Sequence, residues 1–309
     1  MSENENDKLL DLIADWNEIK ASGCAHNIRQ NGRSVERMST ENIQIIPKED
    51  GSGLDIRIAA GTKGEKVAIP ACVTAANIDD LVYNDFYVGE GADVTIIAGC
   101  GIHVHNGEEA RHSGIHRFFM ERDSKAVYLE KHVGTGGMRD TKRVIDPVTE
   151  VYLEEGSCLE MDTSQIGGVD STKRITKGSV KAGAKLIIKE HLLTEGEERA
   201  STSFQVTLDG DGSAVDLVSR SVAKDHSYQE YRSEIVGNAV CTGHSECDAI
   251  ITGSGRVNAS PALYAANEDA SLIHEAAIGK IAGEQIMKLR TFGLTEEEAE
   301  QKIIEGFLR

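Results

Sequence analysis

Two separated stretches near the C-terminus carry the side chains best suited to metal or thiol chemistry. Cys247 lies within Ser245–Ile251, and His274 and Glu275 are adjacent within Ser271–Ala277. A thiol combined with nitrogen and oxygen donors suits iron, zinc or an iron–sulfur cluster. Adjacent residues of a strand point to opposite faces, so His274 and Glu275 could serve one site only at a bend or an edge. Spacing alone leaves a second interpretation open, because free cysteine is among the most buried residue types and Cys247 could be structural.

A second group of candidate ligands begins at Cys100. Four of the ten histidines fall within 14 residues shortly after it, namely His103, His105, His112 and His116. His103 and His105 would share one face of a strand, and a thiol with imidazoles could hold a metal ion. The alternative is that these are polar histidines at the solvated edge of a glycine-rich loop. Their role stays open at the level of the sequence.

Common catalytic motifs are absent. Residues 61–66 lack the glycine–lysine–hydroxyl order of a phosphate-binding loop, and neither a G-x-S-x-G elbow nor an H-E-x-x-H helix occurs. We therefore expect a binding or assembly scaffold rather than an enzyme. The 51 Asp and Glu residues leave paired carboxylates for glycoside chemistry open, so a β-helix protein that binds or cleaves polysaccharides is the alternative. An aromatic content of only 5% argues against a sugar-stacking groove.

Composition narrows the class of partner. The 309 residues are enough for one large domain with appendages, and the net charge of −18 without a Lys/Arg cluster argues against nucleic acid and against a basic membrane-surface face. The sequence contains no run of about 18 apolar residues, so no membrane span is predicted. The acidic residues 1–7 do not resemble a signal peptide. Six scattered cysteines without a CxxC pair are typical of reduced thiols, so we expect a cytoplasmic protein.

The elements that must position these residues follow from periodicity. Residues 6–22 are predicted to form one helix, with an apolar stripe that includes Trp16 and with Gly23 after its end. From about residue 42 a period of two predicts strands for about two hundred residues. From about residue 282 helices return, and Thr295 with Glu298 forms the sequence pattern of a capping box.

A weak repeat runs through the strand region. A small turn residue precedes a short strand five times, with matching positions at Val94, Ala126, Leu159, Leu186 and Val215, spaced 32, 33, 27 and 29 residues apart. Such periods indicate stacked supersecondary units. No helix fits within each unit, so two or more strands per unit are predicted, in a parallel β-helix or a stacked β-sandwich.

Three C-terminal segments, in this order and spacing, resemble the SufB/SufD family of iron–sulfur cluster assembly proteins. The segments are Gly243–Asp248, Leu272–Ile281, and Gly293–Ala299 continuing to Phe307. The likeness extends upstream through Gly99–Cys100 and Tyr152–Gly156, and so covers most of residues 85–309. The chain is most similar to the short SufB-like proteins of the SmsB type in archaea and anaerobic bacteria.

The resemblance implies a mainly β fold, a right-handed parallel β-helix between helical ends. It implies an N-terminal helical region at 1–40, a β-helix core at 41–270 and a C-terminal helical region at 271–309 that docks a SufC-like ATPase. The protein would be a scaffold on which a transient iron–sulfur cluster is built, while ATP hydrolysis belongs to the partner. A flavin would be compatible with such a complex, but nothing in the sequence supports one.

The resemblance also implies roles for individual residues. Cys247 would be the cluster-assembly thiol near a subunit interface, with Glu275 as a second ligand and His274 beside it. Cys100 matches the position that accepts sulfur, from a donor such as a cysteine desulfurase, and passes it through the β-helix interior. Ile273 departs from SufB chains that carry an acidic residue there. We interpret the chain as a homodimer replacing the SufB–SufD heterodimer, with recipient apo-proteins taking the finished cluster.

Overall fold

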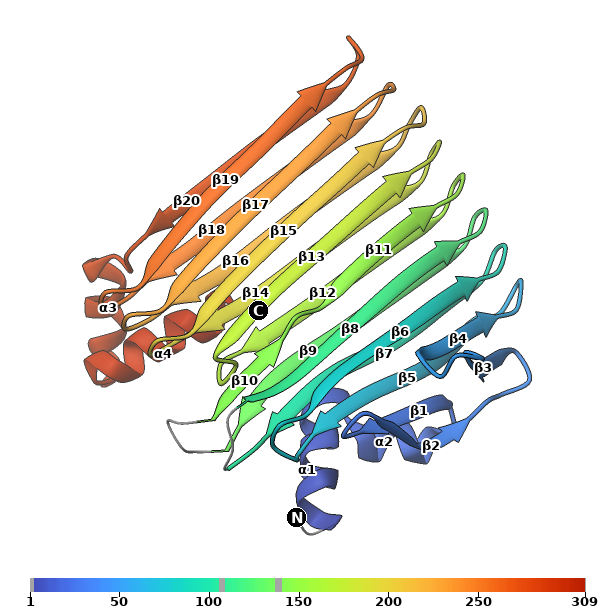
Figure 1. The fold of residues 1–309 in the computed structure, drawn as a ribbon. Helices are drawn as coiled ribbons and strands as arrows, with labels where there is room; N and C mark the ends of the chain where they lie inside the picture. The colour runs from blue at the N-terminus through green and yellow to red at the C-terminus, as the bar shows by residue number, and fades with distance from the viewer. Residues whose placement is uncertain (1–2, 106–108, 137–140, 309) are drawn as a thin grey trace.

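The chain folds into a β-solenoid, as Figure 1 shows, in a computed structural model that describes residues 3–105, 109–136 and 141–308. From β4 on, successive strands alternate between two facing sheets, except that β10 and β11 both belong to the second sheet. Within each sheet the strands are parallel except for one antiparallel pair at the N-terminal edge. This pair is β1–β2 in one sheet and β3–β4 in the other. The predicted mainly β, stacked-strand fold with helices at both ends is confirmed.

The first sheet contains the strands that carry Cys100, Cys247, His274 and Glu275. Its order is β2 (Arg33–Met38), β1 (Ala25–Gln30), β5 (Lys63–Val73), β7 (Asp93–His103), β9 (Lys125–Thr135), β12 (Cys158–Ile166), β14 (Lys185–Thr194), β16 (Ala214–Ala223), β18 (Thr242–Ile251), β20 (Ser271–Gly279).

The second sheet closes the other side of the solenoid. Its order is β19 (Arg256–Ala265), β17 (Tyr228–Gly237), β15 (Arg199–Leu208), β13 (Ser171–Val180), β10 (Lys142–Ile145), β8 (Glu109–Met120), β6 (Asp79–Val88), β4 (Gly53–Ile58), β3 (Ile43–Pro47), with β11 (Val148–Leu153) also pairing with β8 and β13.

The predicted repeat is the register of the first sheet. The five matching positions are Cα partners on neighbouring strands, and all five side chains are buried in the core: Val94, Ala126, Leu159, Leu186 and Val215. The turn residue three positions before each has a positive φ, at Gly91, Asp123, Gly156, Gly183 and Gly212. This left-handed conformation favours glycine and, less strongly, Asp, which explains why small turn residues recur.

The N-terminal helical prediction was wrong in one respect. Two helices, α1 (Glu3–Ala14) and α2 (Trp16–Ser22), replace the single helix expected over 6–22, because Asp15 between them adopts a left-handed conformation with φ 49°. Gly23 ends α2 as predicted. Together with Trp16 and Ile19, α1 covers the outer face of the first sheet near β5 and β7.

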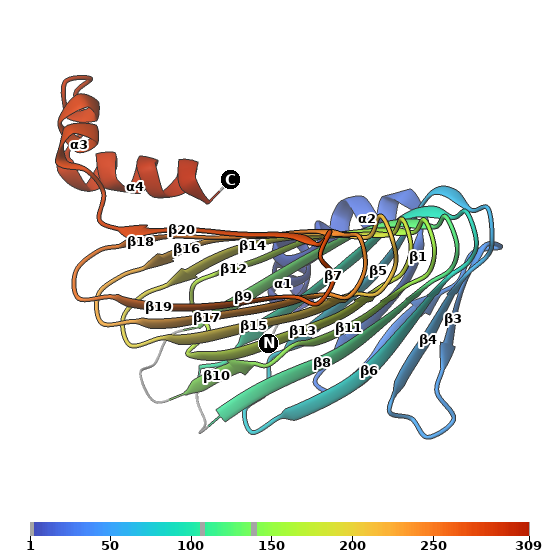
Figure 2. The ribbon, with the colours of Figure 1, turned by 90° about the horizontal axis from the view of Figure 1, so that it is seen from above.

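The C-terminal helices follow the last turn of the solenoid. They are α3 (Gly283–Arg290) and α4 (Glu296–Phe307). The predicted capping box is confirmed, since the Glu298 N–H donates to Thr295 Oγ1 at 3.1 Å and the Thr295 N–H donates to Glu298 Oε2 at 2.8 Å. Figure 2 shows both helices standing off the sheet that ends in β20. Strands β1, β2 and β20 lie inside the terminal regions that were expected to be helical.

The C-terminal end of the solenoid is uncapped. Strands β19 and β20 are edge strands, and large apolar side chains on them are exposed: Leu263, Tyr264, Ile273 and Ile278. At the other end, the β1–β2 and β3–β4 hairpins form the edges of the two sheets. No helix among the described residues is long and apolar enough to cross a bilayer.

Candidate functional site

Cys247 faces the solenoid interior near its open end. Side chains of β18 alternate between core and surface, and this alternation leaves Cys247 only 1% exposed within the main apolar core. Its Cα partner on the edge strand β20 is Ala276, a small residue. Burial, with smaller contributions from Glu190 and Asp248, raises the pKa of the Cys247 thiol to about 12. The thiol is therefore protonated at neutral pH until a metal or a base removes the proton.

His274 and Glu275 lie on opposite faces of β20. His274 is half-buried and belongs to the same alternating set as Ala276, so it shares the interior face with Cys247. Its Nδ1 atom is buried and has no hydrogen-bond partner among the residues that the structure describes, which is uncommon for a polar atom and leaves a donor or acceptor available. Glu275 is exposed on the outer face, where its Cα partner is Glu246. Within one chain the structure thus brings Cys247 and His274 to one face and Glu275 to the other.

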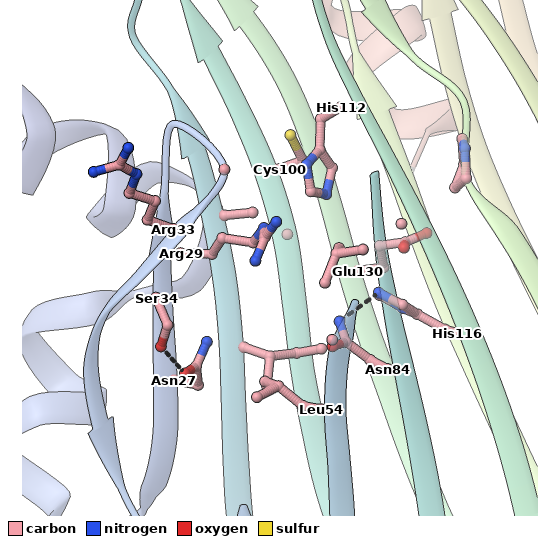
Figure 3. Close-up of a pocket in the computed structure, with 18 of the residues that line it drawn as sticks. Asn27, Arg29, Arg33, Ser34, Leu54, Asn84, Cys100, His112, His116 and Glu130 are labelled. Carbon is pink, nitrogen blue, oxygen red and sulfur yellow. Dashed lines mark hydrogen bonds between the residues drawn. The ribbon is translucent and has the colours of Figure 1, made fainter. Parts of the chain in front are cut away.

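Cys100 also faces the interior, on β7 near the opposite end of the solenoid. It is 1% exposed and borders a cavity of about 270 Å³ whose far wall includes exposed side chains of β2 such as Arg33 (Figure 3). Burial, then neighbouring acidic groups, raises the pKa of the Cys100 thiol well above its ordinary value. Like Cys247, Cys100 is a protonated thiol at neutral pH.

The glycines beside Cys100 have a packing explanation. A Cβ atom on Gly99 would lie 2.7 Å from the carbonyl oxygen of Ile13, and one on Gly101 would lie 2.6 Å from the side chain of Leu9. Both contacts are with α1. The glycines therefore let α1 lie directly on the outer face of the sheet, while Cys100 between them points inward.

The four histidines after Cys100 do not converge on one site. His103 and His105 contact each other, with 2.9 Å between their Nε2 atoms, near the end of β7. His112 is buried beside Asp80, at 3.0 Å from Nδ1 to Oδ2, and His116 is buried with its Nδ1 at 2.7 Å from the hydroxyl of Tyr128. The only group of three or more potential metal ligands found within the described residues lies elsewhere, on the outer face near β20.

A file of buried polar side chains connects the two thiols through the interior. His132 is the Cα partner of Cys100, and Arg174 of β13 donates to its Nδ1 at 3.2 Å. Arg174 also donates to Glu130 at 2.5 Å and lies 3.7 Å from Glu190.

The same file continues toward the C-terminal end. Glu190 accepts hydrogen bonds from the hydroxyls of Thr202 and Ser219, at 2.8 and 2.7 Å. Ser219 is the Cα partner of Cys247. Neighbouring strands lie about 4.8 Å apart, so the file ends one strand from the thiol.

Burial and neighbouring charges keep the ionisable side chains of this file in fixed protonation states near pH 7. Burial opposes ionisation of Glu130, but the Arg174 guanidinium and a hydrogen bond from His132 outweigh burial and hold the pKa of Glu130 well below its ordinary range. Burial lowers the pKa of His132, and lowers that of His116 to about 4, so both imidazoles are neutral.

Sequence reasoning missed Glu130, Arg174 and Glu190. Their signal was present in the repeat: Glu130 and Glu190 occupy strand positions of the same parity as the apolar core residues, where a charged side chain needs a buried partner. Arg174 comes from the facing sheet, and only the three-dimensional pairing of the sheets shows that it meets both carboxylates.

Comparison with known proteins places the chain in a family. A family model described as "SUF system FeS cluster assembly, SufBD core domain" matches residues 83–307. The chain belongs to the SufBD family. The predicted family resemblance is therefore confirmed, and the protein is a SufBD-family iron–sulfur cluster assembly protein.

Individual relatives support the same assignment. An "Iron-sulfur cluster assembly SufBD family protein" of Archaeoglobus fulgidus is 30% identical over 271 residues, covering 87% of this chain and 71% of the relative. A SufBD family protein of Methanocaldococcus jannaschii is 26% identical, over 91% of this chain and 89% of the relative. The "Iron-sulfur cluster assembly protein SufB" of Bacillus subtilis is 25% identical, over 86% of this chain and 59% of the relative. The chain spans 62% of two Methanothermobacter relatives.

Proposed function

We propose that this SufBD-family chain is the scaffold subunit of a SUF-type complex and builds a nascent iron–sulfur cluster at the open end of its solenoid. One observation supports this proposal above the others: Cys247 shares the interior face with His274, whose buried Nδ1 has no partner, next to the uncapped last turn. Family membership favours cluster assembly over the polysaccharide-active alternative.

The cluster is cargo, and its ligands would be Cys247, His274 and Glu275. Thiolate and imidazole are suited to iron in such clusters. Because β20 is the edge strand, iron lying just beyond it could meet His274 from the interior and Glu275 from the outer face. A carboxylate binds iron more weakly than a thiolate does, which would ease release of the cluster to recipient apo-proteins.

Reconstitution tests the cluster site. The Cys247→Ser variant, treated anaerobically with ferrous iron and sulfide, should retain less than a tenth of the iron and acid-labile sulfide of the unaltered chain. The Cys158→Ser variant is the matched control, because Cys158 is a half-buried free cysteine on β12. Equal iron and sulfide contents in Cys247→Ser and the unaltered chain would refute the site.

Sulfur would enter at Cys100 as a persulfide and, after reduction to sulfide, reach Cys247 through the interior, since the side chains of the file cannot carry sulfur covalently. In the first step a donor persulfide transfers its terminal sulfur to Cys100: a new S–S bond forms and the donor's S–S bond breaks. The Cys100 proton goes to the departing donor thiolate, which leaves as a thiol. Reduction of the transferred sulfur to sulfide takes two electrons from an external reductant.

The choice of sulfur source tests this route. Cys100→Ser should assemble cluster normally from free sulfide but lose assembly when a cysteine desulfurase is the sulfur source, because only the second route needs the entry thiol. Loss of assembly with both sources would show a structural defect instead, and normal assembly with both would exclude Cys100 from the route.

An ABC-type ATPase of the SufC class would dock on α3 and α4. None of the residues of α3 is buried, and Met287 and Phe292 are 60% and 76% exposed around it. In co-expression with the ATPase, Phe292→Ala together with Met287→Ala should abolish co-purification, whereas Tyr152→Ala, which removes another exposed apolar side chain, should not. Undiminished co-purification of the double variant would remove these helices from the interface.

Two copies would pair through the uncapped last turn. The exposed apolar residues Tyr264 and Ile273 lie on the edge strands β19 and β20, which have unpaired backbone groups. Light scattering should give a dimer for the unaltered chain and a monomer for Ile273→Lys. Ile166→Lys is the control, because Ile166 is similarly exposed on an interior strand. A monomeric unaltered chain at micromolar concentration would contradict the proposal.

A further inference from the structure

We propose that His244, Glu246 and Glu275 form a binding site for a divalent transition-metal cation on the outer face of the first sheet. One ligand atom from each residue, an imidazole nitrogen or a carboxylate oxygen, lies within 4.8 Å of those of the other two. No sequence pattern singled out this group, because its members come from two strands about thirty residues apart.

The register of β18 and β20 creates the site. Glu246 and Glu275 are Cα partners on neighbouring strands, so their side chains project side by side. His244 precedes Glu246 by two residues and therefore projects from the same face. Cys247 projects from the opposite face, so the outer group and the interior thiol are separated by the thickness of the sheet.

A fourth residue orients the imidazole. Asp216 of β16 is the Cα partner of His244, and its Oδ1 accepts a hydrogen bond from Nδ1 of His244 at 2.8 Å. This bond fixes the tautomer and leaves Nε2 as a lone-pair donor. A carboxylate bound to the second ring nitrogen is the usual support of a metal-ligating histidine.

The two carboxylates argue for a cation between them. Like charges directly opposite each other on neighbouring strands destabilise a sheet. Among the described residues no Lys or Arg makes an ion pair with Glu246 or Glu275; Arg220 acts on Glu246 only through its field. A bound cation would remove the repulsion. One imidazole and two carboxylates suit Fe²⁺, Mn²⁺, Co²⁺ or Zn²⁺, whereas a soft Cu⁺ site would need sulfur.

The site would hold iron on the outer side of β18 and β20 before it meets sulfur on the inner side. Glu275 would belong both to this outer cation site and to the cluster site, because it projects from the outer face of the edge strand β20. Cation binding by the three side chains stands independently; only its use as an iron-loading step rests on the proposed function.

Anaerobic titration with Co²⁺, a spectroscopic substitute for Fe²⁺, tests the inference on the full chain. We expect saturable Co²⁺ binding that needs no cysteine ligand and is therefore retained, without thiolate-to-cobalt absorption, in Cys247→Ser. His244→Ala and Glu246→Gln should each weaken binding at least tenfold. His226→Ala, which removes an exposed histidine from a distant turn, and Cys247→Ser should bind as the unaltered chain does.

The outcomes separate this inference from the proposed function. Absence of saturable binding in the Cys247→Ser chain, or loss of binding there but not in His244→Ala, would overturn the outer site. Retained Co²⁺ binding in a Cys247→Ser chain that builds no cluster would support both. Circular dichroism of each variant verifies that the solenoid is intact, and Glu275→Gln supplies a further substitution for the same test.

Discussion

Replacing Arg174 with methionine would test the electrostatics of the solenoid interior. The guanidinium is buried, donates to Glu130 at 2.5 Å and to His132 at 3.2 Å, and lies 3.7 Å from Glu190. Methionine has a similar unbranched length and no charge. The substitution therefore leaves two buried carboxylates without their cation and changes side-chain volume little.

The expected cost follows from this arrangement. Breaking a buried ion pair by removing one partner costs about 3–5 kcal/mol of unfolding free energy, because the remaining charge is buried without compensation. Loss of Arg174 would also remove the interaction that lowers the pKa of Glu130, so Glu130 would take up a proton on folding. Glu130→Gln added to Arg174→Met should consequently restore part of the lost stability.

Urea denaturation followed by circular dichroism measures the free energy of unfolding, and urea is uncharged, so it does not screen the ion pairs. Arg232→Met is the control, because Arg232 is 62% exposed and its ion pair with Glu230 should contribute about 0.2–1 kcal/mol. A loss for Arg174→Met no larger than the loss for Arg232→Met would refute the reasoning. So would a double variant that is less stable than Arg174→Met alone.

Three further predictions concern other parts of the fold. Gly99→Ala should lower stability by about 1–3 kcal/mol, because its Cβ would meet the Ile13 carbonyl at 2.7 Å, whereas Gly279→Ala, with open space around it, should not; equal melting temperatures would contradict this packing. Since burial lowers the pKa of His116 from 6.5 to about 4, the unfolded chain binds a proton that the folded chain does not, and stability should fall as pH drops from 6.5 to 4. His116→Gln should remove roughly 2–3 kcal/mol of that fall, as urea titrations at pH 7 and 4.5 would measure, and an unchanged pH profile would contradict it. Thr295→Ala should destabilise α4 by about 1 kcal/mol and speed amide exchange at Glu298, while unchanged exchange would argue against the cap.

Much of the fold could be predicted because the repeat in the sequence is itself the register of the sheet. The positions Val94 to Val215 stack as Cα partners, and the residues three before them adopt the left-handed turn conformation that favours Gly or Asp. The capping box at Thr295 is likewise a local signal with a local cause. Both features depend on residues close in the chain or on a strict period.

Other features depend on contacts between distant segments and could not be predicted. The helix break at Asp15 lies inside a continuous apolar stripe, so periodicity gave no sign of it. Strand alternation did imply that His274 and Glu275 separate, but not that Glu275 meets His244 and Glu246. The meeting of Arg174 with Glu130 and Glu190 requires knowing how the two sheets face each other.

The nitrogen ligand of the reconstituted cluster is the most direct test of where the cluster forms. Pulsed electron paramagnetic resonance of the reduced, paramagnetic cluster in a chain labelled with ¹⁵N-histidine should detect one coupled ¹⁵N nucleus. That coupling should vanish in His274→Ala and persist in His244→Ala, because His274 shares the interior face with Cys247 and His244 lies on the outer face. A cluster with no ¹⁵N coupling, or a coupling that survives in His274→Ala, would contradict an assembly site at the open end of the solenoid.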